Sequence, residues 1–568
     1  IIFIVEALDW LVIGVFFLAL IGIIVWVVRQ KQNDSADYFL GGRDATWLAI
    51  GASIFASNIG SEHLIGLAGA GASSGMAMAH WEIQGWMILI LGWVFVPFYT
   101  RSMVYTMPEF LERRYNPQSR TILSVISLVS YVLTKVAVTV YAGGLVFQQV
   151  FGIKELWGID FFWIAAIGLV VLTALYTIFG GMKSVLYTSV LQTPILLLGS
   201  LIILVLGFKE LGGWDEMMRV CGAVTVNDYG DTMTNLIRSN DDANFPWLGA
   251  LIGSAIIGFW YWCTDQFIVQ RVLSGKNEME ARRGTIFGAY LKLLPVFLFL
   301  IPGMIAFALH QKYIGAGGEG FLPMLANGTA NADAAFPTLV AKLLPAGVKG
   351  LVVCGILAAL MSSLASLFNS SAMLFTIDFY KRFKPETPEK KLVGIGQIAT
   401  IVIVVLGILW IPIMRSVGDV LYTYLQDVQS VLAPGIAAAF LLGICWKRTS
   451  AQGGMWGLIS GMVIGLTRLG AKVYYSNAGE VADSTFKYLF YDMNWLFFCG
   501  WMFLFCIIVV IVVSLATEAP TAEKIQGLVF GTATKEQKAA TRASWNHWDI
   551  IHTVIILAIT AAFYWYFW

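Results

Sequence analysis

The chain has 568 residues, of which 58% are hydrophobic and only 12% are charged. Because a soluble domain carries about 25% charged residues, this composition indicates an integral membrane protein. The formal net charge is +1, which excludes the strongly basic surface of a nucleic-acid-binding protein.

Hydropathic runs of about 18 to 30 residues recur along the chain, a length that fits transmembrane helices rather than the short alternating strands of a barrel. The expected fold is an all-α integral membrane protein with about fourteen transmembrane helices in a plasma membrane. The expected helices span residues 9–29, 45–71, 76–100, 121–150, 159–180, 184–207, 246–270, 283–311, 347–380, 392–414, 418–446, 450–472, 493–516 and 547–567.

Lysine and arginine are concentrated in alternate connections between the expected helices. About 23 lie in one set of connections and about 9 in the other, and cytoplasmic loops carry the excess. The basic set includes residues 29–43 and 517–546, so these are predicted to be cytoplasmic and both termini to lie outside. The long connections 208–245 and 312–346 then lie outside as well. Short loops further suggest a bacterial inner membrane.

The second and seventh expected helices are each followed by four more, which gives two blocks of five helices. The blocks enter the membrane from opposite sides, as in many secondary transporters, where the first helix of each block is broken and the site lies between them. The expected divisions are a first helix and cytoplasmic loop (1–44), a first repeat (45–207), an extracellular loop (208–245), a second repeat (246–446) and three further helices (447–568).

A polar cluster interrupts the expected second helix, GASIFASNIGSEHLIGLAGAG, at Asn58, Ser61, Glu62 and His63. Unpaired polar groups are costly in hydrocarbon, so such a cluster is expected to face a partner or a wet cavity. If the helix opens near residues 57–60, the freed carbonyl oxygens become ligands for a hard cation such as Na⁺. The alternative is that the glycines form a packing interface between helices.

Aromatic residues are concentrated in the opening helix of the second block, GFWYWCTDQFIVQR. Three adjacent rings, Trp260 to Trp262, precede Asp265 and Gln266. Flat apolar faces beside hydrogen-bonding groups suit the binding of sugars. The alternative is an interfacial aromatic belt.

Charged residues inside the expected helices need partners, because a charge at a helix centre costs about 2.5–3.5 kcal/mol. Glu82 and Lys292 are predicted to pair and to hold a neutral polyol between them. The alternative is an ion pair that fixes helix register, which we favour for Lys135 and Arg468. No nucleophile–base pair or cofactor motif is present, and the six cysteines and five histidines are scattered. The sequence therefore predicts neither an enzyme nor a metal centre.

The segment ALMSSLASLFNSS offers oxygen ligands on one helix face. Ala359, Ser362 and Ser363 share that face because they lie at i, i+3 and i+4. Neutral oxygen ligands suit Na⁺ better than a soft metal. Small hydroxyl residues also serve as packing groups in membrane helices, which is the alternative interpretation.

Taken together, several stretches resemble the sodium/glucose cotransporters of the solute:sodium symporter family, and the resemblance extends over most of the chain. The stretches are DYFLGGR (37–43), ASNIGSEHLIGLAG (56–69), YTMPEFLERRYN (105–116), FGGMKSVLYTSVLQT (179–193), FWYWCTDQFIVQRVLSGKN (259–277), MSSLASLFNSS (361–371) and APGIAAAFLLGICWKR (433–448).

The resemblance implies a leucine-transporter-type inverted repeat, with one helix before the ten-helix core and three after it. It also implies roles for particular residues. A Na⁺ site would use Ala56, Ile59, Ala359, Ser362 and Ser363; a sugar site would use Asn58, His63, Glu82, Trp262, Lys292 and Gln426; Tyr261 would form an inner gate and Leu67, Trp81 and Tyr422 would close the site from outside.

The resulting expectation is Na⁺-coupled uptake of a neutral hexose, glucose or galactose, by alternating access across the lipid bilayer. No cofactor is expected besides the co-transported Na⁺. Two departures from the family pattern leave details open. Ser189 replaces the usual Asp, which leaves open whether a second Na⁺ is carried with each sugar. Gly258 replaces a polar or small hydroxyl residue near the sugar, which leaves the exact hexose preference open. Myo-inositol, another polyol, an anion, or a sugar sensor or channel are the alternatives.

Overall fold

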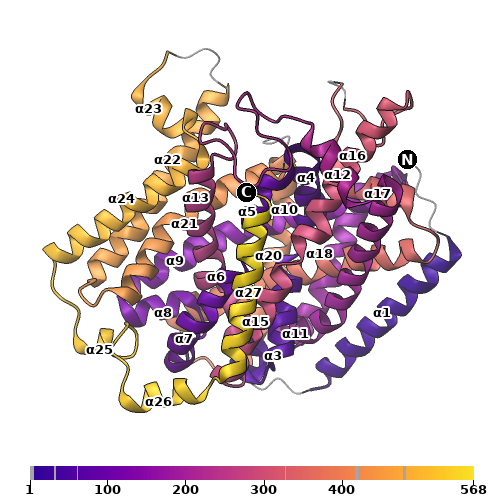
Figure 1. Cartoon of the computed structure of the whole chain (residues 1–568). Coiled ribbons are helices and arrows are strands. Elements are labelled where there is room, and N and C mark those ends of the chain that lie inside the picture. Colours follow the sequence, from indigo (N-terminus) through magenta and orange to yellow (C-terminus); the bar gives the residue numbers. More distant parts are fainter. Residues whose placement is uncertain (1–5, 31–33, 61, 326–327, 416–420, 478–481) are drawn as a thin grey trace.

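The computed structural model describes residues 6–30, 34–60, 62–325, 328–415, 421–477 and 482–568. Nearly all of this part of the chain is helical, and the long helices lie side by side in one bundle (Figure 1). Within the described residues, each segment for which hydropathy predicts a spanning helix is mainly helical. Ten helices of the described residues are long and apolar enough to cross a membrane. The expected number of fourteen crossings stays a prediction.

In the first half of the chain, several expected helices are interrupted. Helix α11 (Phe161–Leu211) covers two of them, and Gly181 divides it with φ 54° and ψ −149°. A side chain is strained at this φ, and a Cβ here would collide with the carbonyl oxygen of Tyr38. The expected break between residues 180 and 184 is therefore confirmed. The other elements are α1 (Ala7–Val28), α2 (Ser35–Leu40), η1 (Gly41–Arg43), α3 (Trp47–Asn58), η2 (Glu62–Leu67), α4 (Ala68–Ser74), η3 (Gly75–Met78), α5 (Ala79–Glu82), α6 (Gly85–Ile90), η4 (Leu91–Phe95), α7 (Val96–Ser102), α8 (Met107–Arg114), α9 (Pro117–Ser130), η5 (Tyr131–Val136), α10 (Ala137–Phe151) and the short antiparallel strands β1 (Glu155–Leu156) and β2 (Ile159–Asp160).

In the second half, helix α18 (Val348–Met373) lies at the centre of the bundle and packs against α1, α3 and α11. Figure 1 shows α1 at one edge and α24 at the opposite edge. The remaining elements are α12 (Trp214–Gly222), α13 (Trp247–Gly258), η6 (Phe259–Thr264), α14 (Gln266–Leu273), α15 (Glu278–Lys292), η7 (Val296–Leu300), α16 (Ile301–Gly315), η8 (Ala332–Ala334), α17 (Ala335–Leu343), η9 (Leu374–Tyr380), α19 (Lys381–Phe383), α20 (Glu389–Arg415), α21 (Leu421–Cys445), α22 (Ala451–Asn477), α23 (Thr485–Lys487), η10 (Tyr488–Asp492), α24 (Trp495–Ala516), α25 (Ala522–Ile525), α26 (Lys535–Ala543) and α27 (His547–Tyr566).

The two ends of the bundle differ in the segments that cover them. Helices α12, α17 and α23 lie at one end and α25 and α26 at the other (Figure 1). Helix α1 begins and α27 ends at the α12 end, as an even number of crossings requires. The expected outer loop folds over this end, because the carbonyl of Met233 accepts a hydrogen bond from Met76 at 2.8 Å and the amide of Leu236 donates to Phe567 at 2.9 Å. The assignment of the α25 and α26 end to the cytoplasm stays a prediction.

A buried carboxylate joins α1 to α18. One oxygen of Asp9 accepts the backbone N–H groups of Gly347, at 2.6 Å, and Gly350, at 2.7 Å. These donors belong to the first turn of α18, where helix N–H groups have no partner within the helix and the dipole favours negative charge. A Cβ at Gly350 would lie 2.7 Å from the backbone of Asp9, so glycine permits this close approach.

We expect Asp9→Asn to lower the melting temperature of the purified protein, because hydrogen bonds to a charged group contribute about 1.5–3 kcal/mol each. Thermal unfolding followed by size-exclusion fluorescence measures the change. The exposed Asp44 provides a control, since Asp44→Asn removes a charge of the same kind without a buried contact. Equal melting temperatures for both variants would contradict this role of Asp9.

Candidate functional site

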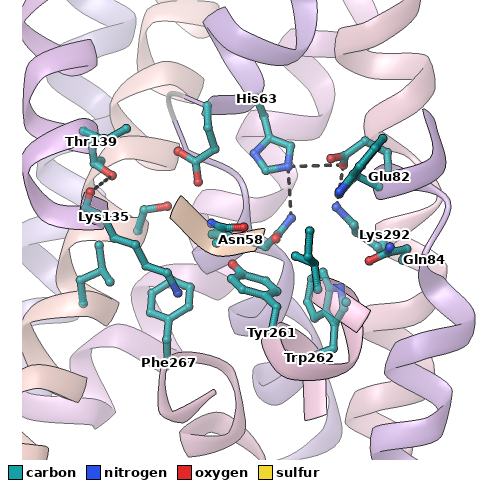
Figure 2. A pocket seen from close by; sticks show the side chains of 18 residues that line it. Asn58, His63, Glu82, Gln84, Lys135, Thr139, Tyr261, Trp262, Phe267 and Lys292 are labelled. Carbon is teal, nitrogen blue, oxygen red and sulfur yellow. Dashed lines mark hydrogen bonds and ion pairs between the residues drawn. The ribbon is translucent and has the colours of Figure 1, made fainter. Parts of the chain in front are cut away.

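A cavity inside the bundle is lined by residues from both expected blocks. Seven of its lining residues are among those predicted to bind or enclose a sugar (Figure 2). The lining consists of Asn58, Glu62, His63, Trp81, Glu82, Gln84, Lys135, Val138, Thr139, Ile257, Gly258, Tyr261, Trp262, Phe267, Lys292, Ser363, Leu367 and Gln429.

The polar residues reach the cavity where two helices are interrupted. Helix α3 ends at Asn58, and Ile59 is extended with φ −80° and ψ 106°. In the second block, the π-helix η6 follows α13, and Asp265 is extended with ψ 127°. Both expected helix breaks are therefore present, and each contributes side chains to the cavity.

A chain of buried polar side chains crosses the cavity wall. The ammonium of Lys292 lies 2.6 Å from Glu82 Oε2, and His63 Nε2 lies 3.3 Å from the same oxygen. The ring of His63 is in turn 3.4 Å from the amide of Asn58. Figure 2 shows these four side chains turned toward one another. The ion pair predicted between Glu82 and Lys292 is confirmed.

Three polar atoms at this wall are left without partners. Glu62 Oε2, His63 Nδ1 and Trp81 Nε1 are buried and make no hydrogen bond to any described residue. An unsatisfied buried polar atom costs about 1–3 kcal/mol, and native structures rarely leave several together. Because these atoms belong to residues of one cavity, a ligand with several hydroxyl groups can satisfy them. Sequence reasoning placed Glu62 in the polar cluster but not among the ligands.

A second charged group lies beside the aromatic residues of η6. Lys135 Nζ is 2.6 Å from Asp265 Oδ2, and the Tyr131 hydroxyl donates to the other carboxylate oxygen. The same ammonium lies 4.7 Å from the ring centroids of Tyr261 and Phe267. The ion pair favoured for Lys135 is therefore present, and its cation also lines the cavity.

Arg271 on α14 is fully buried, yet none of its three side-chain nitrogens has a hydrogen-bond partner among the described residues. Its guanidinium lies 5.0 Å from the ring centroid of Phe267. A buried charge without hydrogen bonds carries a desolvation penalty of several kcal/mol. Sequence reasoning did not single out Arg271, because it follows the aromatic run near an expected helix end.

We expect Arg271→Met to raise the melting temperature, because an apolar side chain of similar length removes the desolvation penalty. Arg282 provides a matched control: it is equally buried but contacts Glu278 at 2.8 Å and donates to Ser544. Arg282→Met should lower the melting temperature in the same thermal assay. A lower melting temperature for Arg271→Met would show that the charge of Arg271 stabilises the fold and would contradict this interpretation.

Backbone oxygens and a hydroxyl converge where α3 ends against α18. Ser363 Oγ donates to the carbonyl of Ser57 at 2.9 Å and lies 3.2 Å from the carbonyl of Ile59. The structure thus brings the predicted sodium ligands Ile59 and Ser363 together. The hydroxyl of Ser362 lies 3.4 Å from that of Ser189 instead. The carbonyl of Ser57 lies within the opening predicted at residues 57–60, although it was not in the ligand set that the family resemblance implied.

The remaining predicted residues are placed as follows. Ala56 and Ala359 are buried in α3 and α18. Leu67 is buried in η2, and Trp81 stacks on Trp495 with 5.5 Å between ring centroids. The predicted residues Tyr422 and Gln426 lie outside the residues whose side chains the structure describes.

Comparison with known proteins identifies the family. The model of the Sodium:solute symporter family matches residues 38–461. The chain is 36% identical to the sodium/myo-inositol cotransporter 2 of Homo sapiens, over 93% of this chain and 79% of that protein. It is also 36% identical to the sodium/glucose cotransporter 4 of Danio rerio, over 92% and 80% of the two chains. The chain belongs to the sodium:solute symporter family.

Membership in the sodium:solute symporter family makes this chain a Na⁺-coupled symporter and a multi-pass membrane protein. A solved Na⁺-coupled sialic acid symporter in a substrate-bound outward-open state has a TM-score of 0.73 at 21% identity, over 91% of this chain and 99% of that one. This similarity shows the leucine-transporter-type fold. The relatives are transporters rather than enzymes. The repeat boundaries, the outside position of the termini and the bacterial membrane stay predictions.

Proposed function

We propose that this symporter couples Na⁺ entry to the uptake of a neutral cyclic polyol by alternating access. The observation that carries the proposal is the hydrogen-bonded chain from Lys292 through Glu82 and His63 to Asn58, which ends beside unpartnered polar atoms. The aromatic ring of Trp262 lines the same cavity. Hydroxyl groups of a sugar ring match the polar atoms, and its C–H faces match the aromatic ring.

The charges of the cavity favour a neutral solute over an anion. Its described lining holds two carboxylates, Glu62 and Glu82, and two ammonium groups, Lys135 and Lys292. Each ammonium already contacts a carboxylate at 2.6 Å. An anionic solute would have to compete with these carboxylates, and buried ion pairs are costly to break.

A hexose, glucose or galactose, is the first candidate, and myo-inositol is the second. The relatives named above support both, since one is a sodium/myo-inositol cotransporter and the other a sodium/glucose cotransporter. All three solutes are uncharged six-membered rings with several hydroxyl groups. The cavity chemistry described above therefore suits each of them.

Uptake into proteoliposomes tests the proposal. Radiolabelled glucose, galactose and myo-inositol are supplied in parallel, with Na⁺ or with K⁺ or choline in its place, and with an imposed inside-negative potential. We expect one of the three solutes to accumulate above its external concentration only with Na⁺. Binding without accumulation would instead indicate a sensor, and equilibration without accumulation would indicate a channel.

The coupling ion is proposed to bind between α3 and α18. An ion held by the carbonyl of Ile59 and the hydroxyl of Ser363 would join the broken helix to the central helix. Because Asn58 and His63 lie on the segment that carries this break, ordering the break would also order part of the polyol site. Each charge that moves inward gains about 2.3 kcal/mol per 100 mV of membrane potential.

We expect Ser363→Ala to abolish Na⁺-dependent uptake, because the variant removes a hydroxyl that reaches the carbonyls of Ser57 and Ile59 at the end of α3. Ser371→Ala is a matched control on the same helix, since the Ser371 hydroxyl is buried without a described partner. Size-exclusion chromatography confirms that both variants fold. Wild-type Na⁺ dependence in Ser363→Ala would reject the proposed sodium site.

We expect Glu82→Gln to raise the KM for the transported polyol about tenfold or more, since hydrogen bonds to a charged group contribute about 1.5–3 kcal/mol. The Na⁺ concentration for half-maximal uptake should change little. Glu82→Asp keeps the negative charge near Lys292, so its KM for the polyol should rise less than that of Glu82→Gln. An unchanged KM in Glu82→Gln for every tested solute would remove Glu82 from the polyol site.

A further inference from the structure

Gln84 and Gly258 share one space in the cavity wall, although they come from different blocks of the chain. A Cβ at Gly258 would lie 2.5 Å from Oε1 of Gln84 and 2.9 Å from its Cδ. A Cβ at these distances would overlap the amide oxygen and carbon of Gln84, so position 258 accepts no side chain while Gln84 keeps its place. Both residues line the cavity.

The amide of Gln84 is fixed in one orientation. Its Nε2 donates to the carbonyl of Ser254 at 2.8 Å, one turn before Gly258 on α13. Gln84 is only 3% exposed and lies at the junction between α5 and α6. No described residue donates a hydrogen bond to its Oε1. An oriented acceptor without a described partner therefore lies in the space that a side chain at position 258 would fill.

This acceptor lies close to the ion pair of the proposed polyol site. Glu82 is two residues earlier in the chain, and Figure 2 shows Gln84 next to Lys292 on the same side of the cavity. The three side chains therefore present a carboxylate, an ammonium and a neutral amide toward the same region. A polyol held by the ion pair has neighbouring hydroxyl groups within reach of the amide.

We propose that Gln84 binds substrate and determines which polyol this symporter prefers, in the space left open by Gly258. This inference rests on the proposed function and deepens it. A small hydroxyl side chain at position 258, such as serine, could rotate and either donate or accept a hydrogen bond. The fixed Oε1 of Gln84 can only accept one. A ring hydroxyl must point toward Gln84 and donate to it.

Stereoisomers that turn this hydroxyl away lose the hydrogen bond and leave the acceptor unpaired. Sites built to hydrogen-bond a substrate group discriminate strongly against analogues that lack it, because the buried polar atom then has no partner. Glucose and galactose differ in the direction of one ring hydroxyl, and myo-inositol differs from both in carrying a hydroxyl on every ring carbon. The amide of Gln84 thus distinguishes among the three candidates by hydroxyl direction.

The test uses the full-length protein in proteoliposomes and compares Gln84→Ala with Gly258→Ser. Initial rates of Na⁺-driven uptake give KM and kcat/KM for glucose, galactose and myo-inositol. We expect Gln84→Ala to raise KM for the best substrate about three- to tenfold, because one hydrogen bond to the substrate is lost. The kcat/KM values for the three solutes should also become more similar. The Na⁺ concentration for half-maximal uptake should stay within about twofold of wild type.

Gly258→Ser should produce a similar loss by displacing the amide. The double variant should be no worse than Gly258→Ser alone, because the two changes act on one space. Gln397→Ala is the control: Gln397 also donates its amide to a backbone carbonyl, that of Ile178 at 3.1 Å, but it lies on α20 away from the cavity. It should keep wild-type selectivity.

The outcomes separate this inference from the proposed function. Absence of Na⁺-driven uptake of all three solutes in the wild-type protein would reject the proposed function itself. Wild-type uptake with unchanged KM and selectivity in Gln84→Ala would reject only the role of Gln84. A shift in Na⁺ activation as large as the shift in KM would also reject it, since that indicates a structural effect. If Gly258→Ser does not fold, Gln84→Ala still decides, because it only removes atoms.

Discussion

The architecture depends on the need to hydrogen-bond every backbone polar group in an apolar environment. Helices meet this need along their length, so any break must supply other partners. At the end of α3 the partner is the Ser363 hydroxyl of α18, which reaches the carbonyls of Ser57 and Ile59. The position of α18 beside the end of α3 therefore supplies the hydrogen bond that the break in α3 needs. The same break turns Asn58 and His63 toward the cavity, so the central helix indirectly positions the polyol site.

A second constraint is the pairing of buried charges. Glu82 with Lys292 and Asp265 with Lys135 form contacts of 2.6 Å, and both ammonium groups lie at the cavity. With both ammonium groups paired, Glu62 is the remaining carboxylate of the described lining, which favours a ring of hydroxyl groups over an acid. Arg271 departs from this pattern. Its burial without hydrogen bonds carries a desolvation cost that the packing around η6 and α14 has to offset.

Much of the fold could be predicted from the sequence, because hydropathy locates helices and the cost of buried polar groups locates sites. The break near Asn58 and the pair of Glu82 with Lys292 followed from these costs alone. The role of Gln84 did not, because it depends on the missing side chain of Gly258, which lies in the other block of the chain. The same contact gives a physical reason for a glycine at that position. Spacing predicted an opening near residues 57–60 but could not fix which carbonyls α18 reaches, and the structure shows those of Ser57 and Ile59.

The hydrogen bonds of Ser363 also bear on the return of the empty carrier. In the proposed sodium site, an ion needs the lone pairs of this hydroxyl, so its hydrogen must turn away from the carbonyls of Ser57 and Ile59. Once such an ion left, the single hydroxyl hydrogen would turn back to the carbonyl of Ser57 at 2.9 Å, the nearer of the two acceptors. The end of α3 would then have a partner on α18 both with and without the ion. The affinity for the ion would be lowered by the hydrogen bond that it displaces, and release of the ion would restore that bond.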